Sequence, residues 1–343
     1  METMRAVVLT GHGGFDKLEY RDDVPVPEPG PGEVLIQVGA AGVNNTDVNT
    51  RVGWYSGGGW GGGFAFPRIQ GADVAGRIVA VGSGIRRTRV GERVLVDPIL
   101  RDPDDPDDRA KSGYLGSERD GGFAEFAAVP AVNAFAIESE FSDAELATFP
   151  CSYSTAENML TCAGLLDDES VVITGASGGV GSALVQLAKR RGAYVVAVAG
   201  RDKMDVVEAV GADVVLARDQ SGLEDALRKA LPGGEADVAA DVVGGDGFPM
   251  LIDLLKRGGR YVTSGAIAGP VVALDLRTLY LRDLSLFGGT IMPRGVFGAL
   301  VSHIERGEVR PLLAGTFPLE QIREAQEAFV EKRHVGNFVL LPG

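Results

Sequence analysis

A glycine-rich turn between an apolar strand and a helix is the part of this chain best suited to chemistry. Residues 171–181 read Val-Val-Ile-Thr-Gly-Ala-Ser-Gly-Gly-Val-Gly, and the residues up to 191 continue with helical spacing. Glycine lets a backbone approach the pyrophosphate of a dinucleotide, and the unpaired amides at a helix start attract its charge. A second apolar stretch, 193–199, supplies the next strand. The pattern predicts a dinucleotide-binding unit, although a glycine turn that binds nothing is the alternative. The expected contacts come from Ser177, Gly178, Gly179 and Val180.

The end of the second strand indicates which dinucleotide is bound. A unit specific for NAD usually has Asp or Glu there, to accept hydrogen bonds from the adenosine ribose. This chain has Gly200, Arg201, Asp202 and Lys203 instead. Gly200 leaves room for a ribose 2′-phosphate, and Arg201 and Lys203 supply the opposite charge, so we predict NADP(H). Two alternatives stay open: Asp202 turns inward as the acidic residue, or the two cations belong to a solvated helical turn.

The composition is that of a globular protein with little attraction for polyanions. The 343 residues are 45% hydrophobic and 23% charged, and the formal net charge is −14. That charge argues against nucleic acid or an anionic membrane as the main partner. No apolar run approaches the roughly 20 residues that span a bilayer. The first residues lack the apolar core of a secretory signal, and two cysteines make no disulfide framework. A reducing cytoplasm is therefore the expected location.

The order of strand and helix patterns predicts an α/β protein of two domains. Residues 1–132 are expected to form a mostly β domain, with one helix at 46–53 and strands at 5–9, 33–40, 75–81, 93–96 and 123–129. Residues 133–289 alternate strands with helices, as in a doubly wound parallel sheet. The later strands of that sheet are expected at 214–216, 237–243, 259–264 and 284–288. We expect the tail, 290–343, to complete the first domain with helices at 295–306 and 319–332 and a strand at 337–341.

Six short motifs occur in the order found in a known family. They are Gly-Glu-Val-Leu-Ile-Gln-Val (32–38), Gly-Val-Asn (42–44), Gly-Glu-Arg-Val (91–94), Gly-Gly-Phe-Ala-Glu-Phe (121–126), the turn at 175–181 and Gly-Ala-Asp (211–213). Over its whole length the chain resembles the medium-chain dehydrogenases/reductases, and within them the zinc-independent quinone oxidoreductase (zeta-crystallin-like) branch. The resemblance implies a GroES-like catalytic domain, a Rossmann NADP-binding domain and a small-molecule substrate. It also implies a homodimer formed through the strand at 284–288.

The residues at the family's zinc positions differ from those of the zinc enzymes. In those relatives, catalytic zinc is held by a Cys before a Ser/Thr-Asp pair, a His-Glu pair after a glycine, and a later Cys. Here the first position is Asn44, the pair is Ala72-Asp73, and only Cys151 remains. One thiolate and one carboxylate cannot supply three protein ligands plus water. We therefore expect no metal, and Cys151 is then a small apolar residue or, alternatively, a reactive thiol.

Without a metal to stabilise an alkoxide, hydride transfer to an electrophilic carbon is the easier reaction. Such carbons occur in quinones, enones and enoyl thioesters, and the protein must then stabilise the enolate that forms. By their position in the family, three residues are catalytic candidates: Asn44 as an amide donor, Thr46 as a proton relay and Tyr55 as a general acid. The alternatives are that Tyr55 only packs beside Trp54, and that the Thr46 hydroxyl caps a helix or a turn.

Other positions are assigned by register with the relatives. Cofactor contacts are expected from Thr155, Arg218, Val243 and Gly265, and from Asn337, where many relatives have Lys. The glycine-rich segment 56–63, with Trp54 and Trp60, is interpreted as a lid over an apolar substrate, or else as a tolerated insertion. The acidic segment 102–108 lacks the glycine and the distal glutamate of a calcium loop, which favours a solvated surface.

The resulting prediction is an NADPH-dependent, zinc-free oxidoreductase that transfers hydride to an activated double bond. An alcohol dehydrogenase or carbonyl reductase of the same superfamily is the second hypothesis. A non-enzymatic NADPH-binding protein is the third. The loops 54–66 and 97–120, which shape the pocket in the relatives, carry no pattern that names the substrate.

Overall fold

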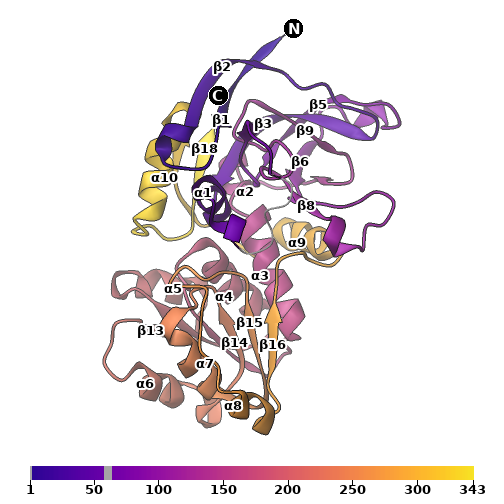
Figure 1. Ribbon diagram of the computed structural model, residues 1–343. Helices are drawn as coiled ribbons and strands as arrows, with labels where there is room; N and C mark the ends of the chain where they lie inside the picture. The colour runs from indigo at the N-terminus through magenta and orange to yellow at the C-terminus, as the bar shows by residue number, and fades with distance from the viewer. Residues whose placement is uncertain (1, 58–63) are drawn as a thin grey trace. The chain divides into compact units, whose positions relative to one another are not determined.

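The computed structural model describes residues 2–57 and 64–343, and its contacts divide the chain into two units (Figure 1). Unit 1 comprises Met1–Cys151 and Phe297–Gly343, and unit 2 comprises Ser152–Val296. The boundaries thus differ from those expected: residues 133–151 lie in unit 1 and residues 290–296 in unit 2. For the first segment the reason is packing, because helix α2 (Asp143–Leu146) lies against the central strands of unit 1.

Unit 1 is built on two β-sheets and a short hairpin. The smaller sheet has the order β2-β1-β4, and its strands are β1 (Thr3–Leu9), β2 (Leu18–Pro25) and β4 (Arg68–Ile69). The larger sheet has the order β10-β6-β5-β3-β18-β17, with β9 also paired to β3. Its strands are β3 (Glu33–Val43), β5 (Ala75–Val81), β6 (Arg93–Val96), β9 (Phe126–Pro130), β10 (Ala134–Ala136), β17 (Leu313–Pro318) and β18 (Asn337–Leu341). The hairpin joins β7 (Ile99–Leu100) to β8 (Gly113–Tyr114). Unit 1 is therefore mostly β, as predicted.

Helices are short and few in the described part of unit 1. The α-helices besides α2 are α1 (Asn45–Val52), α9 (Val296–Glu305) and α10 (Ile322–Val330). The 3-10 helices are η1 (Phe15–Lys17), η2 (Trp54–Gly57), η3 (Arg87–Arg89), η4 (Arg109–Lys111) and η8 (Leu319–Gln321). The helix expected at 319–332 is thus a 3-10 turn followed by α10.

The C-terminal tail packs into unit 1. β18 runs antiparallel to β3, with Phe338 opposite Val43 and Leu340 opposite Ala41. Helix α10 buries Ile322, Ala325 and Phe329 in the same core as the strand residues of β3. The burial of these apolar side chains stabilises the return of the chain.

The strand expected at 123–129 begins only at Phe126. Before it, the backbone is bonded to another segment: the Phe123 N–H donates to the Gln70 carbonyl (2.8 Å), and the Gly122 N–H donates to that of Gly71 (2.8 Å). A Cβ added to Gly121 would overlap the Gly71 carbonyl oxygen. Gly121 therefore allows the two backbone segments to approach this closely, and the strand begins only after this approach, at Phe126.

Unit 2 contains one parallel sheet, as expected of a Rossmann domain. The strand order is β13-β12-β11-β14-β15-β16, and every neighbouring pair is parallel. The strands are β11 (Ser170–Ile173), β12 (Tyr194–Ala199), β13 (Val214–Ala217), β14 (Ala236–Asp241), β15 (Leu255–Thr263) and β16 (Ser285–Gly288). The helices are α3 (Pro150–Ala163), α4 (Gly179–Arg190), α5 (Met204–Val210), α6 (Leu223–Ala230), α7 (Phe248–Leu254) and α8 (Leu276–Leu281), with η5 (Arg201–Lys203), η6 (Pro232–Gly234) and η7 (Gly245–Gly247).

The strand order of unit 2 places a binding crevice. The chain runs outward from β11 to β12 and β13, and then returns to the other side of β11 as β14. In open α/β sheets, ligands bind beyond the carboxyl ends of the strands at such a reversal. The glycine-rich turn after β11 lies at this place.

Candidate functional site

The glycine-rich turn of unit 2 leads directly into α4, whose N-cap is Gly178. The first amides of a helix have no acceptor within it, so they can bind an anion. Gly175 has a φ of +60°, and a Cβ on Gly181 would overlap the Gly175 carbonyl oxygen. Only glycine therefore lets the helix start pack this closely on the strand. The predicted pyrophosphate contacts lie together at this positive end of α4: Ser177, Gly178, Gly179 and Val180.

Basic residues follow the ends of two neighbouring strands. Arg201 and Lys203 stand in η5, directly after β12 and Gly200. Arg218 stands directly after β13, and its backbone N–H donates to the Ala199 carbonyl (2.8 Å) at the end of β12. The fold therefore brings these three predicted cations to one edge of the sheet.

The charges at this edge of the sheet interact with one another. Burial lowers the pKa of Lys203, and the positive charge of Arg218 acts in the same direction, against the opposing effect of Asp202. Arg201 is more exposed and forms an ion pair with Asp219 (Nη2 to Oδ1, 3.3 Å). The edge thus carries three cations and two carboxylates, and Asp202, the alternative acidic residue, is exposed.

A buried carboxylate that the sequence analysis did not single out shapes the crevice. Asp241, at the end of β14, accepts hydrogen bonds from the Val243 N–H (2.8 Å), the Gly244 N–H (3.1 Å), the Tyr261 hydroxyl (2.7 Å) and the Thr174 hydroxyl. These bonds fix the ends of β11, β14 and β15 together. The predicted contacts Val243 and Gly265 lie at this edge, with the Gly265 carbonyl accepting from Thr263 Oγ1 (3.0 Å). An acid at the end of an apolar strand is the sequence signal that could have found Asp241.

In unit 1, a polar network stands at the positions that bind zinc in the zinc enzymes. Asp73 is fully buried and accepts hydrogen bonds from Asn44 Nδ2 at Oδ2 (2.7 Å) and from the Cys151 N–H at Oδ1 (2.5 Å). Asn44 is the N-cap of α1, and its backbone N–H donates to Asp47 Oδ2 (2.8 Å). The side-chain amide of Asn44 is therefore turned toward Asp73. Because Asn44 is the cap, Thr46 is not: it is the second residue of α1, which excludes the N-cap alternative.

The two carboxyl groups of this network are held in an apolar surrounding. Burial raises the pKa of Asp47 and that of Asp73 to about 7 each. Hydrogen bonds from Asn44 oppose the rise in both cases, and the charge of Asp73 adds to it for Asp47. Near neutral pH the pair therefore retains bound protons that exposed carboxylates would have lost.

Strand β8 brings a phenol to the same network. The Tyr114 hydroxyl donates to Cys151 Sγ at 3.2 Å. Burial raises the pKa of Tyr114 well above its ordinary value, and Cys151 and Asp73 act in the same direction, so the phenol keeps its proton. Tyr114 could not be predicted from the sequence, because nothing in the irregular segment 97–120 connects it to a cysteine 37 residues further on.

The remaining predicted residues lie on several elements. Tyr55 is in η2, and its hydroxyl accepts a hydrogen bond from Asn49 Nδ2 (3.3 Å) on α1. Thr155 is partly buried on α3 in unit 2. Asn337 is buried at the start of β18 in unit 1. Trp60 and the rest of 58–63, on which the lid interpretation depends, lie outside the described residues.

The donor atoms at the former metal positions do not fit zinc. Among residues 2–57 and 64–343, no three His, Cys, Asp or Glu side chains are arranged to hold a metal ion. Asn44 and Asp73 are bonded to each other, and Cys151 Sγ is the one thiol at the site. A catalytic zinc needs three such protein ligands and an open position.

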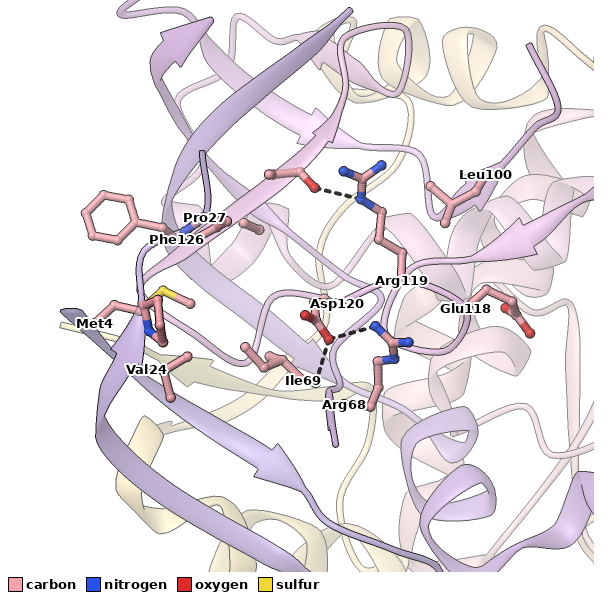
Figure 2. Close-up of a pocket in the computed structure, with 14 residues that line it drawn as sticks. Met4, Val24, Pro27, Arg68, Ile69, Leu100, Glu118, Arg119, Asp120 and Phe126 are labelled. Atoms are coloured by element: carbon pink, nitrogen blue, oxygen red, sulfur yellow. Dashed lines mark hydrogen bonds and ion pairs between the residues drawn. The ribbon is translucent and has the colours of Figure 1, made fainter. Parts of the chain in front are cut away.

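A cavity of about 550 Å³ in unit 1 contains none of the predicted residues (Figure 2). Its two arginines are already bonded: Arg68 Nη1 pairs with Asp120 Oδ1 (2.8 Å), and Arg119 Nε donates to the Ala128 carbonyl (3.0 Å). Glu118 also lines this cavity, and its Oε2 accepts from the Tyr114 N–H (2.8 Å). The cavity wall thus helps to hold Tyr114.

A two-unit architecture with a nucleotide-type parallel sheet and a mostly β unit defines a dehydrogenase of the GroES-like type. Residues 30–139 match the model of the alcohol dehydrogenase GroES-like domain, and residues 179–306 match that of the zinc-binding dehydrogenases. The chain belongs to the medium-chain dehydrogenase/reductase superfamily.

The relatives of this chain include reductases of coenzyme A thioesters and a protein provisionally assigned as an alcohol dehydrogenase. It is 32% identical to the acryloyl-coenzyme A reductase of Metallosphaera sedula, over 98% of this chain and 99% of the relative. A protein of Sinorhizobium meliloti 1021, provisionally assigned as an alcohol dehydrogenase, has a crystal structure with a TM-score of 0.96 and 49% identity, covering 99% and 97% of the two chains. A 2-octenoyl-CoA carboxylase reductase in complex with NADP and 2-octenoyl-CoA has a TM-score of 0.89 and 27% identity, covering 99% and 88%.

Proposed function

We propose that this protein is an NADPH-dependent oxidoreductase that reduces an activated carbon–carbon double bond without a metal. One observation carries the proposal: the Asp73 carboxyl group accepts hydrogen bonds from the Asn44 side-chain amide and from the Cys151 N–H. The residues at the positions where the zinc enzymes hold their metal are thus bonded to one another. Without a Lewis acid, an alcohol has no ready route to an alkoxide, whereas the β-carbon of an enone, quinone or enoyl thioester is already electrophilic. The acryloyl-coenzyme A reductase relative supports this substrate class.

The choice of NADPH is supported by the cations beyond β12 and β13. Arg201, Lys203 and Arg218 stand around Gly200, where an NAD-specific unit would have a carboxylate. A ribose 2′-phosphate placed there would meet positive charge. The relative that was crystallised with 2-octenoyl-CoA also carries NADP.

The residues of the chain divide the remaining work. Bound NADPH supplies the hydride. We assign Tyr55 as the donor of the proton that completes the reduction, and Thr46 as a hydroxyl that relays protons. Asn44 fixes the start of α1 through Asp47 and Asp73, so we now place its contribution in positioning as much as in donating to a ligand. Thr155, Val243, Gly265 and Asn337 are proposed as further cofactor contacts.

A second candidate function is supported by the relative that shares 49% identity, which is provisionally an alcohol dehydrogenase. An alcohol dehydrogenase or carbonyl reductase would oxidise alcohols with NADP or reduce aldehydes with NADPH. A non-enzymatic NADPH-binding protein would do neither. One panel separates the three: 1,4-quinones, enones, enoyl-CoA esters, aldehydes and alcohols, each followed by NADPH absorbance. Turnover confined to aldehydes and alcohols would overturn our proposal, and so would no turnover at all.

We further propose that the protein forms a homodimer through the edge strand β16. Its side chains Leu286 and Phe287 are 39% and 36% exposed, and Leu276, Tyr280 and Leu281 on α8 are also exposed. An unpaired strand edge with apolar residues beside it is suited to pairing with a second copy across a two-fold axis.

None of the helices in the described ranges is long and apolar enough to cross a membrane.

A further inference from the structure

We propose that Tyr114 is a catalytic residue that takes over the metal's role: its hydroxyl donates a hydrogen bond to the substrate's carbonyl oxygen as negative charge develops there. This inference rests on the proposed function. It adds an electrophile that neither the sequence motifs nor the comparisons assign. The sequence offered Tyr55 as a proton donor, and the two tyrosines would perform different tasks.

The position of the phenol is well determined by its surroundings. Tyr114 pairs with Ile99 in the β7–β8 hairpin, and its N–H is held by Glu118 Oε2 (2.8 Å). Its carbonyl accepts from the N–H groups of Ser117 and Glu118 (3.1 Å each). The backbone on both sides of the ring is therefore bonded. A donor that is fixed before the reaction loses little free energy to reorientation when charge develops.

The hydrogen bond that the phenol makes is one that it can exchange. Its acceptor is Cys151 Sγ at 3.2 Å, and sulfur is a weak acceptor. A hydrogen bond to a developing enolate oxygen is charge-assisted and about twice as strong as one between neutral groups. Replacing the thiol by the enolate oxygen as the acceptor is thus favourable during the reaction. The thiol keeps the hydroxyl oriented when no substrate is present.

The other donors of this network are committed to a stronger acceptor. The Asn44 amide and the Cys151 N–H both donate to the Asp73 carboxyl group. Asp73 and Asp47 are buried, whereas Tyr114 and Cys151 are partly exposed. The phenol and the thiol therefore form the more accessible side of the network.

The phenol is also in the right protonation state for this role. Burial and the neighbouring Cys151 and Asp73 keep the pKa of Tyr114 well above its ordinary value. It remains a neutral O–H donor across the physiological pH range, and it does not transfer its proton. Charge stabilisation by Tyr114 is thus distinct from general acid catalysis by Tyr55.

The chemistry balances with one hydride and one proton. A C–H bond forms at the β-carbon with the electron pair of the hydride, and the π pair of the C=C bond moves toward the carbonyl. The carbonyl oxygen becomes an enolate oxygen, to which the Tyr114 hydroxyl donates. A solvent-derived proton delivered through Tyr55 then bonds to the α-carbon, and the C=O bond re-forms. The dinucleotide is oxidised and the alkene is reduced.

The test uses the intact protein with a carbonyl compound that lacks a C=C bond. Cyclohexanone labelled with ¹³C at its carbonyl is added to the protein with NADP, and its C=O stretch is recorded by difference infrared spectroscopy. Turnover of 2-cyclohexenone with NADPH is measured in parallel. The variants are Tyr114→Phe and a matched control, Tyr20→Phe, at a residue that is 40% exposed on β2 of unit 1. Circular dichroism and the Kd for NADPH show whether each variant is folded.

We expect the bound carbonyl band to lie at lower wavenumber in the wild type and in Tyr20→Phe than in Tyr114→Phe. We expect kcat of Tyr114→Phe to fall by about 10²-fold, the usual loss of one oxyanion donor, with NADPH affinity unchanged. A carbonyl band that is the same in wild type and Tyr114→Phe overturns the inference, and so does a failure of cyclohexanone to bind. If the band shifts as expected but no activated alkene is reduced, the proposed function fails while Tyr114 remains a carbonyl donor.

Discussion

Removing the cations beyond β12 and β13 one at a time should weaken NADPH binding and leave NADH binding unchanged. The dinucleotides differ by the 2′-phosphate alone, so the ratio of their Kd values isolates that group. Lys203→Ala and Arg201→Ala are the two informative changes. Arg228→Ala is a matched control, because Arg228 is a surface cation of α6 that pairs with Glu224 within its own helix.

The expected magnitudes follow from the surroundings of each cation. A pair of opposite unit charges about 4 Å apart contributes about 1 kcal/mol in water and about 4 kcal/mol near a protein surface of lower dielectric. Arg201 has 65% of its side chain exposed and already pairs with Asp219, so about 1 kcal/mol is expected. Lys203 is more buried, which places it near about 2 kcal/mol. These values correspond to Kd increases of about 5-fold for Arg201→Ala and about 30-fold for Lys203→Ala.

The assay is titration of the protein with each dinucleotide, with binding monitored by the quenching of protein fluorescence or by calorimetry. Raising the ionic strength should narrow the preference for NADPH, since exposed charges are screened by salt. Asp219→Asn should tighten NADPH binding slightly, because it releases Arg201 from its partner. Equal Kd values for NADPH and NADH in the wild type would refute the reasoning. An equal loss of affinity for NADPH and for NADH in Lys203→Ala would refute it as well.

Three further predictions address the network, the glycine turn and the edge strand. The pKa of Asp73 rises from its ordinary 3.8 to about 7 on folding, so the folded chain binds more protons and the free energy of unfolding falls as pH rises between those values. Asp73→Asn should lessen this fall, as measured by urea denaturation at several pH values. The same dependence of the free energy of unfolding on pH in the wild type and in Asp73→Asn would contradict the prediction. Gly181→Ala should lower the free energy of unfolding by about 1–3 kcal/mol, because its Cβ would overlap the Gly175 carbonyl oxygen. Gly178→Ala should leave the free energy of unfolding unchanged, because its Cβ would lie 3.5 Å from the same oxygen. Phe287→Asp should convert a dimer into a monomer in light scattering, while Val132→Asp, at a residue 80% exposed in unit 1, should not; an unchanged mass for Phe287→Asp would refute the β16 interface.

Much of the fold was accessible from the sequence because it depends on local, periodic signals. The parallel sheet of unit 2 follows from apolar runs of strand length that alternate with helices, and each of its strands was expected close to its observed place. A strand was also expected at 337–341, where β18 lies. Among the strands that were missed, β2 has mostly exposed residues, and β17 contains Gly315 and ends at Pro318. Neither contains the apolar pattern on which such predictions rely.

The candidate site was predicted less completely, because it depends on contacts between segments distant in sequence. The glycine turn and the cations are each encoded within a few residues, so they could be recognised directly. The bond from Tyr114 to Cys151 and the cluster around Asp241 join residues on separate elements. Asn44 was expected to offer its amide to a ligand, yet Asp73, 29 residues away, accepts from it. No local pattern records such pairings.

The most direct test of the account is the rate of enoyl-CoA or enone reduction by protein whose metal content has been measured. The protein is treated with a chelator, zinc is determined by elemental analysis, and NADPH consumption is followed with the same sample. We predict turnover at an undiminished rate with far less than one zinc ion per chain. Stoichiometric zinc whose removal abolishes activity, and whose return restores it, would contradict the account.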